Sequence, residues 1–172
     1  MNKIDHPLSD SAVREALGDD TRILKYSELK NYKTIAELLP KPNTFFICLL
    51  EEEQNRGHWT CMMRLKNYYF YFNSYGQRYD RDVSVIPRCV RKILGEDPAR
   101  QFERLLGRRK CEWNKTKLQG ETSQTCGRWC VLAIVFLCFL GHSPTELVEF
   151  LKEKAAATGQ SFDGVVSSII SI

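Results

Sequence analysis

The sequence lacks a hydrophobic run long enough to cross a membrane, and it lacks an apolar core near its start that would direct secretion. Its most apolar stretch, residues 130–140, covers about 11 residues, whereas a membrane-spanning helix needs roughly 20. Residues 1–10 are polar and carry no signal-peptide core. We therefore expect an intracellular protein with no membrane partner.

Histidines are scarce in the sequence, and metal-ligand patterns are missing. The chain has seven cysteines, an odd number that indicates reduced thiols where no secretory signal is present. The close pair of Cys126 and Cys130 has no second pair of Cys or His at ligand spacing. We therefore expect neither a zinc site nor another cofactor. Only three histidines occur, which limits the candidates for a catalytic base.

The 172 residues, with 43% hydrophobic and 27% charged side chains, fit one domain that spans the whole chain. Helical spacing surrounds a central block of strand-like runs, which indicates an α+β fold. We expect helices at residues 9–18, at 27–30 or 35–39, over 84–106 with a break at 95–98, and at 127–140, 143–157 and 161–172. We expect strands at residues 44–50, 58–65 and 68–73, a loop at 51–57, and a further strand within 104–117.

Cys126 is followed by Gly127 at the start of the predicted buried helix. A thiol at a helix N-terminus faces unpaired backbone N–H groups and the positive end of the helix dipole, which stabilise the thiolate. Because the thiolate is the nucleophilic form, this position favours reactivity, and Gly127 would let a substrate backbone approach closely. Without further signals, any one of seven cysteines is more often structural.

His58 opens the predicted strand at residues 58–65 and is the best placed of the three histidines to act as a base. A neutral imidazole takes the thiol proton and later returns it to the leaving amine. His6 lies in the terminal segment, and His142 lies at the far end of the helix from Cys126, roughly 20 Å away at 1.5 Å per residue. Elimination favours His58, and the simpler alternative is a surface histidine at a strand end.

Asn73 ends the strand that is predicted to pair with the one begun by His58. Antiparallel pairing brings these two ends together, so that the amide oxygen of Asn73 can orient the imidazole, as in a Cys-His-Asn arrangement. The alternative is a turn-forming Asn before Ser74.

Three motifs in this order resemble the adenovirus-type endopeptidases and the related SUMO proteases. They are residues 57–59 (GHW), residues 72–76 (FNSYG), and Gln119 placed seven residues before Cys126-Gly127. The spacing of seven is the adenovirus-type pattern. SUMO proteases generally have a spacing one residue shorter, with Asp where this chain has Thr125. The similarity spans roughly residues 44–140, and within the group the chain most resembles proteases of large DNA viruses, virophages and related mobile elements.

The resemblance implies a papain-like-related fold of the adenain/SUMO-protease type, in which a central mixed sheet packs on a buried helix that carries the nucleophile at its N-terminus. It implies Cys126 as the nucleophile, His58 as the base and Asn73 as the third residue. Gln119 would be the side-chain donor of the oxyanion hole, beside the backbone N–H of Cys126. Trp59 would wall the substrate cleft and shield the imidazole.

The sequence departs from the family pattern at Asn73, where the group usually has Asp or Glu, and an amide holds an imidazolium less strongly. Asp80 or Asp82 is an alternative third residue, and Gln124 is an alternative oxyanion donor. Cys130 is the rival nucleophile, since it lies one helical turn after Cys126 on the same face. It lies inside the helix, however, away from the exposed N–H groups.

The resemblance implies a cysteine endopeptidase that cleaves viral precursor proteins, in the host cytoplasm or nucleus or in the virion. The alternative substrate class is a host ubiquitin-like conjugate, cleaved by a deubiquitinase or deSUMOylase-type isopeptidase. A related acetyltransferase would need an acyl-CoA site, and the sequence has no basic pocket motif for one. A catalytically inert binding module is the remaining class.

A basic segment at residues 104–117 contains Arg108, Arg109 and Lys110 together with Trp113. Such a segment is more often a solvated face. It is also the candidate contact for a DNA or peptide activator, or for nucleic acid in an inert protein. The net charge of +4 is compatible with a weak attraction of this kind.

Overall fold

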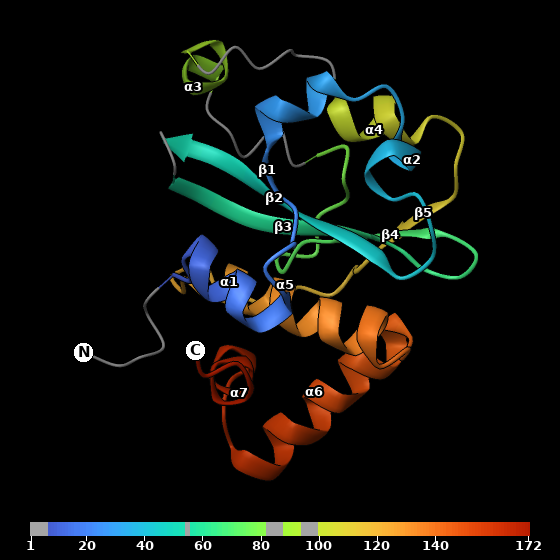
Figure 1. Cartoon of the computed structure of the whole chain (residues 1–172). Helices are drawn as coiled ribbons and strands as arrows, with labels where there is room; N and C mark the ends of the chain where they lie inside the picture. Colours follow the sequence, from blue (N-terminus) through green and yellow to red (C-terminus); the bar gives the residue numbers. More distant parts are fainter. Residues whose placement is uncertain (1–6, 54–55, 82–87, 94–99) are drawn as a thin grey trace.

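The computed structural model describes residues 7–53, 56–81, 88–93 and 100–172, and it has an α+β fold built on a five-stranded sheet (Figure 1). The strands follow one another across the sheet as β1 (Ile23–Lys25), β2 (Thr44–Glu53), β3 (Arg56–Arg64), β4 (Tyr69–Phe72) and β5 (Cys111–Trp113). The pairs β1–β2 and β4–β5 are parallel, and the two central pairs are antiparallel. The sheet is therefore mixed, and the predicted α+β class is confirmed.

Helices cover both faces of the sheet (Figure 1). One face packs against α1 (Asp10–Leu17), α5 (Cys126–Ile134), a π-helical turn that prolongs α5 (Val135–Phe139), α6 (Pro144–Thr158) and α7 (Phe162–Ile169). The other face packs against a 3₁₀ helix (Tyr26–Asn31), α2 (Ile35–Leu38) and α4 (Gln101–Leu106), while α3 (Arg88–Ile93) contacts β2. The helix that begins at Cys126 thus lies against the centre of the sheet.

Successive side chains of β2 enter two different hydrophobic cores. Ile47 and Leu49 pack in the core that includes α5, whereas Phe46, Cys48 and Leu50 pack in the core that includes α2 and α4. A strand buried on both faces needs apolar residues at every position, which explains the unbroken apolar run at the start of β2. The predicted strand at residues 44–50 is confirmed.

Serine side chains cap three of the helices, as the sequence pattern indicates. Ser9 accepts a hydrogen bond from the Ala12 N–H, and Ser143 accepts one from the Glu146 N–H. Ser161 caps α7 through the Gly164 N–H at 3.2 Å. These bonds satisfy N–H groups that have no partner inside the helix.

The predicted loop at residues 51–57 is wrong. β2 continues to Glu53 and β3 begins at Arg56, so that Glu51 pairs with Gly57. Glu51 is buried, and its carboxylate lies 3.9 Å from the Lys25 Nζ atom of β1. Pairing across the sheet overrides the loop-like acidic composition of this segment.

The sequence did not indicate β1, whose three residues are too few to show a period. Within the predicted helical region 84–106, residues 84–87 and 94–99 lie outside the described residues, and α3 and α4 form in the remainder. The predicted strand within residues 104–117 is β5, which is short and pairs with β4.

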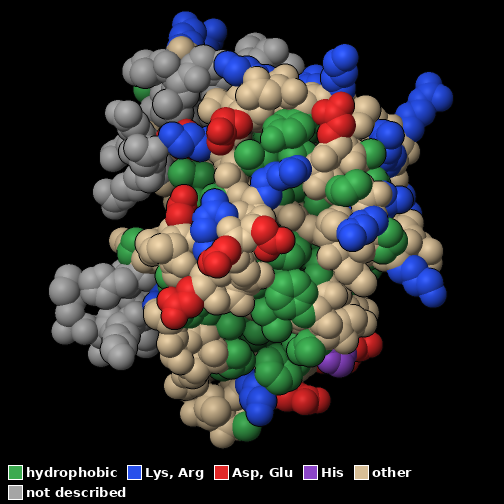
Figure 2. Space-filling view, in the orientation of Figure 1, with side chains coloured by type: hydrophobic (Ala, Val, Ile, Leu, Met, Phe, Trp, Pro, Cys, Tyr) green, Lys and Arg blue, Asp and Glu red, His purple; other side chains and the backbone are tan. Residues whose placement is uncertain are grey.

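Lys and Arg side chains gather along the edge of the molecule where Figure 1 places β5 and the turn between β3 and β4 (Figure 2). Within the part of the chain that the structure describes, no helix is long and apolar enough to span a membrane.

Candidate active site

Cys126 is the first residue of α5, and every residue of this helix is buried. The thiol is 7% exposed. Burial raises its pKa to about 11, although hydrogen bonds from the backbone N–H groups of Trp59, Gly127 and Cys126 itself act to lower it. The helix start does supply the expected N–H groups, but desolvation outweighs them. The expected effect of the helix start on the thiolate is therefore present but smaller than that of burial, and the thiol of the resting protein is protonated at neutral pH.

The thiol reaches β3 because β4 is shorter than β3. β4 pairs with β3 only between Arg64 and Cys61, so the part of β3 that holds Trp59 extends past the end of β4. The backbone N–H of Trp59 donates to the Cys126 sulfur there. The nucleophile candidate thus lies at the residue next to His58.

His58 and Asn73 form a buried hydrogen-bonded pair. The His58 Nε2 atom lies 2.9 Å from the Asn73 Oδ1 atom, and this oxygen also accepts the Tyr75 backbone N–H at 2.9 Å. The side-chain amide of Asn114 binds the backbone of Asn73 on both sides, accepting its N–H at 2.9 Å and donating to its carbonyl at 2.6 Å. Because Asn73 is held at these points, its amide oxygen fixes the direction of the imidazole.

The imidazole of His58 is neutral at physiological pH. Burial lowers its pKa to about 4, and the hydrogen bond to Asn73 raises the pKa only in part. An Asn73 oxygen can only accept, so the Nε2 atom carries the proton and the Nδ1 atom is left as the base. The resting pair of Cys126 and His58 is therefore a neutral thiol and a neutral imidazole.

Tyr75 lies in the FNSYG motif, but the sequence indicated no role for it in the site. Its ring stacks on the His58 imidazole, with 4.7 Å between the ring centroids and 27° between the planes. Burial raises the pKa of the Tyr75 hydroxyl, and the Cys126 thiol, when ionised, acts in the same direction. Trp59 was expected to shield the imidazole, but the ring stacked on it is that of Tyr75.

Trp59 packs in the core with α5 and borders a pocket of about 230 Å³ together with Ile23, Leu49 and Lys25. Its indole is 9% exposed. Trp59 therefore lies at the wall of a depression on the side of β1, whose lining does not include His58.

Gln119 is buried in the loop that leads to Cys126. Its Oε1 atom accepts a hydrogen bond from the Ser74 hydroxyl at 2.6 Å, and its Nε2 atom donates to the Ser123 carbonyl at 2.7 Å. An amide nitrogen carries two N–H bonds, so one remains for a further acceptor. The rival oxyanion donor, Gln124, is exposed.

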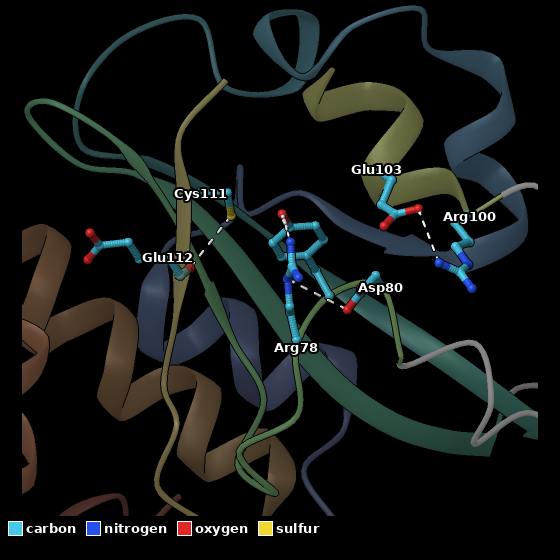
Figure 3. A network of polar contacts seen from close by, with 7 residues as sticks. Arg78, Asp80, Arg100, Glu103, Cys111 and Glu112 are labelled. Atoms are coloured by element: carbon cyan, nitrogen blue, oxygen red, sulfur yellow. Dashed lines mark hydrogen bonds and ion pairs between the residues drawn. The ribbon is translucent and has the colours of Figure 1, made fainter. Parts of the chain in front are cut away.

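The other rival residues have different partners. The Asp80 carboxylate lies 3.7 Å from the Arg78 Nε atom, and Figure 3 shows the two side chains directed at each other. Asp82 lies outside the described residues. Cys130 is fully buried. Burial, and secondly its hydrogen bond to Cys61, raise the pKa of its thiol far above the usual range. Cys130 differs from Cys126 in lying within the helix and in bonding to Cys61 in the core, away from the helix N-terminus.

Gly127 is in contact with the chain itself. A Cβ atom at Gly127 would lie 3.1 Å from the Cβ atom of Leu8, which is buried against the first turn of α5. We expected the space beside Gly127 to admit a substrate backbone, but in the structure Leu8 lies there.

The basic segment lies on the surface after α4, with Arg108, Arg109 and Lys110 exposed. Arg109 and Lys110 border a pocket of about 320 Å³ that Tyr68 and Tyr69 also line. The Lys110 ammonium lies 5.4 Å from the centre of the Tyr68 ring and 3.1 Å from a carboxylate oxygen of Glu112.

The fold and the site define an α+β protein with a buried cysteine, histidine and asparagine at one end of a mixed sheet. Among the described residues, no cluster of His, Cys, Asp or Glu side chains is arranged to hold a metal ion. No family model matches the chain. The chain is 33% identical over 132 residues to the uncharacterized protein V9 of the Sputnik virophage, with 74% of this chain and 75% of that protein covered. It belongs to the same viral protein family as V9.

Proposed function

We propose that this protein is a cysteine endopeptidase that cleaves viral precursor proteins. The observation that carries the proposal is the buried pair of His58 and Asn73, 2.9 Å apart, beside the strand residue whose N–H binds the Cys126 thiol. The proposed nucleophile, base and orienting group come from three separate segments, and the bond of Cys126 to Trp59 places it beside the strand residue next to His58.

The chemistry follows from the neutral resting state. As the Cys126 sulfur bonds to the substrate carbonyl carbon, its proton passes to the Nδ1 atom of His58. The negative charge that develops on the carbonyl oxygen is stabilised by the Cys126 backbone N–H and by the Gln119 amide, once its free N–H turns to the substrate. His58 then gives the proton to the leaving amine, and water hydrolyses the thioester. No cofactor takes part in these steps.

Within the α+β class, we propose the specific fold that the resemblance implies, the papain-like-related fold of the adenain/SUMO-protease type. The order of the site residues along the chain supports it. His58 lies on β3, Asn73 follows β4, and Cys126 begins a buried helix packed on the mixed sheet.

A proteome-derived peptide library, read by mass spectrometry, tests the activity whatever the cleavage motif is. The wild-type protein is expected to release new peptide termini, and the Cys126→Ala variant is expected to release none. A wild-type protein that cuts no peptide, with or without added DNA, would contradict the proposal.

The alternative substrate is a ubiquitin-like conjugate, for which the catalytic chemistry would be the same. Ubiquitin, SUMO and NEDD8 probes with a reactive group at the carboxyl terminus separate the two classes. We expect no probe to label Cys126. Labelling by any of them favours an isopeptidase.

The basic segment at residues 104–117 supports the proposal that DNA or an acidic peptide activates the enzyme. Arg108, Arg109 and Lys110 are exposed, and the ring of Tyr68 lies beside Arg109 and Lys110. Such a surface suits the phosphates and bases of DNA, or the carboxylates of an acidic peptide. Such a protein would act in the host cytoplasm or nucleus, or inside the virion.

A further inference from the structure

Asp163 connects α7 to the loop that carries the candidate site, although it lies far from this loop in the sequence. Its Oδ2 atom accepts the Gly120 backbone N–H at 2.8 Å. Its Oδ1 atom accepts the Thr125 hydroxyl at 2.6 Å and the Trp129 indole N–H at 3.0 Å. One carboxylate therefore holds both ends of the loop and the second turn of α5.

These contacts lie directly beside the residues of the proposed reaction. Gly120 follows Gln119, and Thr125 precedes Cys126. Thr125 is fully buried at the N-cap position of α5, but its side chain makes no capping hydrogen bond there and donates to Asp163 instead. A Cβ atom at Gly120 would lie only 3.0 Å from the Asp163 Oδ2 atom, so the glycine allows the close approach of the carboxylate.

We propose that Asp163 is a positioning residue, which sets the distance between the Gln119 amide and the Cys126 sulfur by holding both ends of the loop between them. This inference rests on the proposed peptidase function. The carboxylate touches neither the substrate nor the reacting atoms. It acts by keeping the oxyanion donor and the nucleophile in a fixed relative position, on which the rate of an acyl transfer depends strongly.

The test uses variants that remove one tether each. In Asp163→Asn the Oδ1 atom still accepts from Thr125 and Trp129, but an amide nitrogen faces the Gly120 N–H and that hydrogen bond is lost. Thr125→Val removes the other loop tether without a change of shape, and Thr125→Ser keeps its hydroxyl. Ser161→Ala is the control for a merely structural role, because it removes the cap of α7 and leaves the Asp163 contacts in place.

In peptide hydrolysis we expect kcat to fall about tenfold or more in Asp163→Asn and in Thr125→Val, with KM changed by less than about threefold. Thr125→Ser and Ser161→Ala should keep kcat within about twofold of the wild type, although Ser161→Ala melts at a lower temperature. A kcat of Asp163→Asn within about twofold of the wild type would overturn the inference. So would a fall in kcat in Ser161→Ala as large as that in Asp163→Asn.

Hydrogen exchange at the Gly120 amide tests the hydrogen bond to Asp163 without any need for peptidase activity. If the wild-type protein hydrolyses no peptide, the proposed function fails, but this measurement still tests the positioning role. Exchange that is faster in Asp163→Asn than in Ser161→Ala supports the positioning role. Equal exchange in these two variants contradicts it.

Discussion

His58 has 5% of its surface exposed, and burial lowers its pKa to about 4. In the unfolded chain the imidazole has a pKa of about 6.5, so between these values the unfolded state binds the extra proton. The free energy of unfolding therefore decreases as the pH falls from about 6.5 to 4. At 1.36 kcal/mol for each pKa unit, this one residue accounts for a loss of about 3 kcal/mol.

A His58→Gln variant should lack this part of the pH dependence. We expect the difference in unfolding free energy between the wild type and His58→Gln to change by about 3 kcal/mol between pH 7 and pH 4, with the wild type losing more. Urea titrations at several pH values measure it. Parallel curves for the two proteins would mean that the imidazole is not buried in its neutral form.

His58 donates its Nε2–H to the neutral amide oxygen of Asn73, where a carboxylate is usual in the resembled family. An Asn73→Asp change places a negative charge 2.9 Å from the Nε2 atom and should raise the pKa of His58 by about one to two units. Protonated His58 cannot take the thiol proton, so the acid limb of the pH–kcat profile should move to higher pH by that amount. If the acid limb of the profile does not move, a group other than His58 controls it. Asn73→Ala serves as the control, because it has neither the amide nor the carboxylate to bond His58.

The three residues of the candidate site could be nominated from the sequence because each stands in a local motif. Tyr75 stands in the same motif as Asn73, but the motif does not show that its ring stacks on His58, and nothing near Asp163 in the chain shows what it touches. The contact of Asp163 with Thr125 joins residues that are 38 positions apart. The reversal of the thiol pKa was also beyond the sequence, because it depends on how completely neighbouring elements exclude water.

At the level of elements, the antiparallel pairing of β2 with β3 places His58. Gly57 comes just before it, and a Cβ atom there would lie 1.9 Å from the Leu50 carbonyl oxygen. Gly57 and Leu50 both belong to paired strands, so neither backbone can move away without breaking the register. The glycine of the GHW motif is thus required by the sheet itself.

Gly57→Ala should destabilise the fold by about 3 kcal/mol or more and should displace His58. Gly127→Ala is the matched comparison, because its new Cβ atom meets only the side chain of Leu8, at 3.1 Å, and alanine favours a helix. We expect Gly127→Ala to change the unfolding free energy by less than about 1 kcal/mol. Denaturant titration of both variants measures the contrast, and equal costs would contradict the strand geometry.

The elements that the sequence predicted well are those with a cap or a long period. Ser9 and Ser143 mark helix starts that the structure has, and the apolar run before Glu51 is a strand. The elements that it missed owe their form to partners. β1 is a strand because it pairs with β2, and the acidic end of β2 is a strand because β3 pairs with it.

At the scale of the whole molecule, Lys and Arg side chains lie on the side of the molecule where Figure 1 places β5, among others spread over the same face (Figure 2). If this side binds DNA, the affinity should fall steeply with salt, since each phosphate contact releases a counterion. Reversing Arg108 and Arg109 to Glu should weaken binding about tenfold or more and reduce the salt slope by roughly two. Reversal of Lys152 and Lys154 on α6 gives the same change of net charge as a control.

Fluorescence anisotropy with a labelled oligonucleotide, at salt concentrations from about 20 to about 200 mM, measures how the affinity depends on salt. No salt-sensitive binding at low ionic strength would remove DNA as a partner. An equal loss in the Lys152 and Lys154 control would show that net charge, and not this side of the molecule, attracts it.

The central claim is that Cys126 is the nucleophile and that His58 is its base. The most direct test combines iodoacetamide alkylation, located by mass spectrometry, with cleavage of the peptide library. A Cys89→Ser background removes the exposed thiol of α3. We expect Cys130→Ala to keep both cleavage and alkylation at residue 126, and His58→Gln to slow both by about 10². Cys126→Ala should abolish cleavage, and a Cys126→Ala protein that still cleaves peptides would contradict the account.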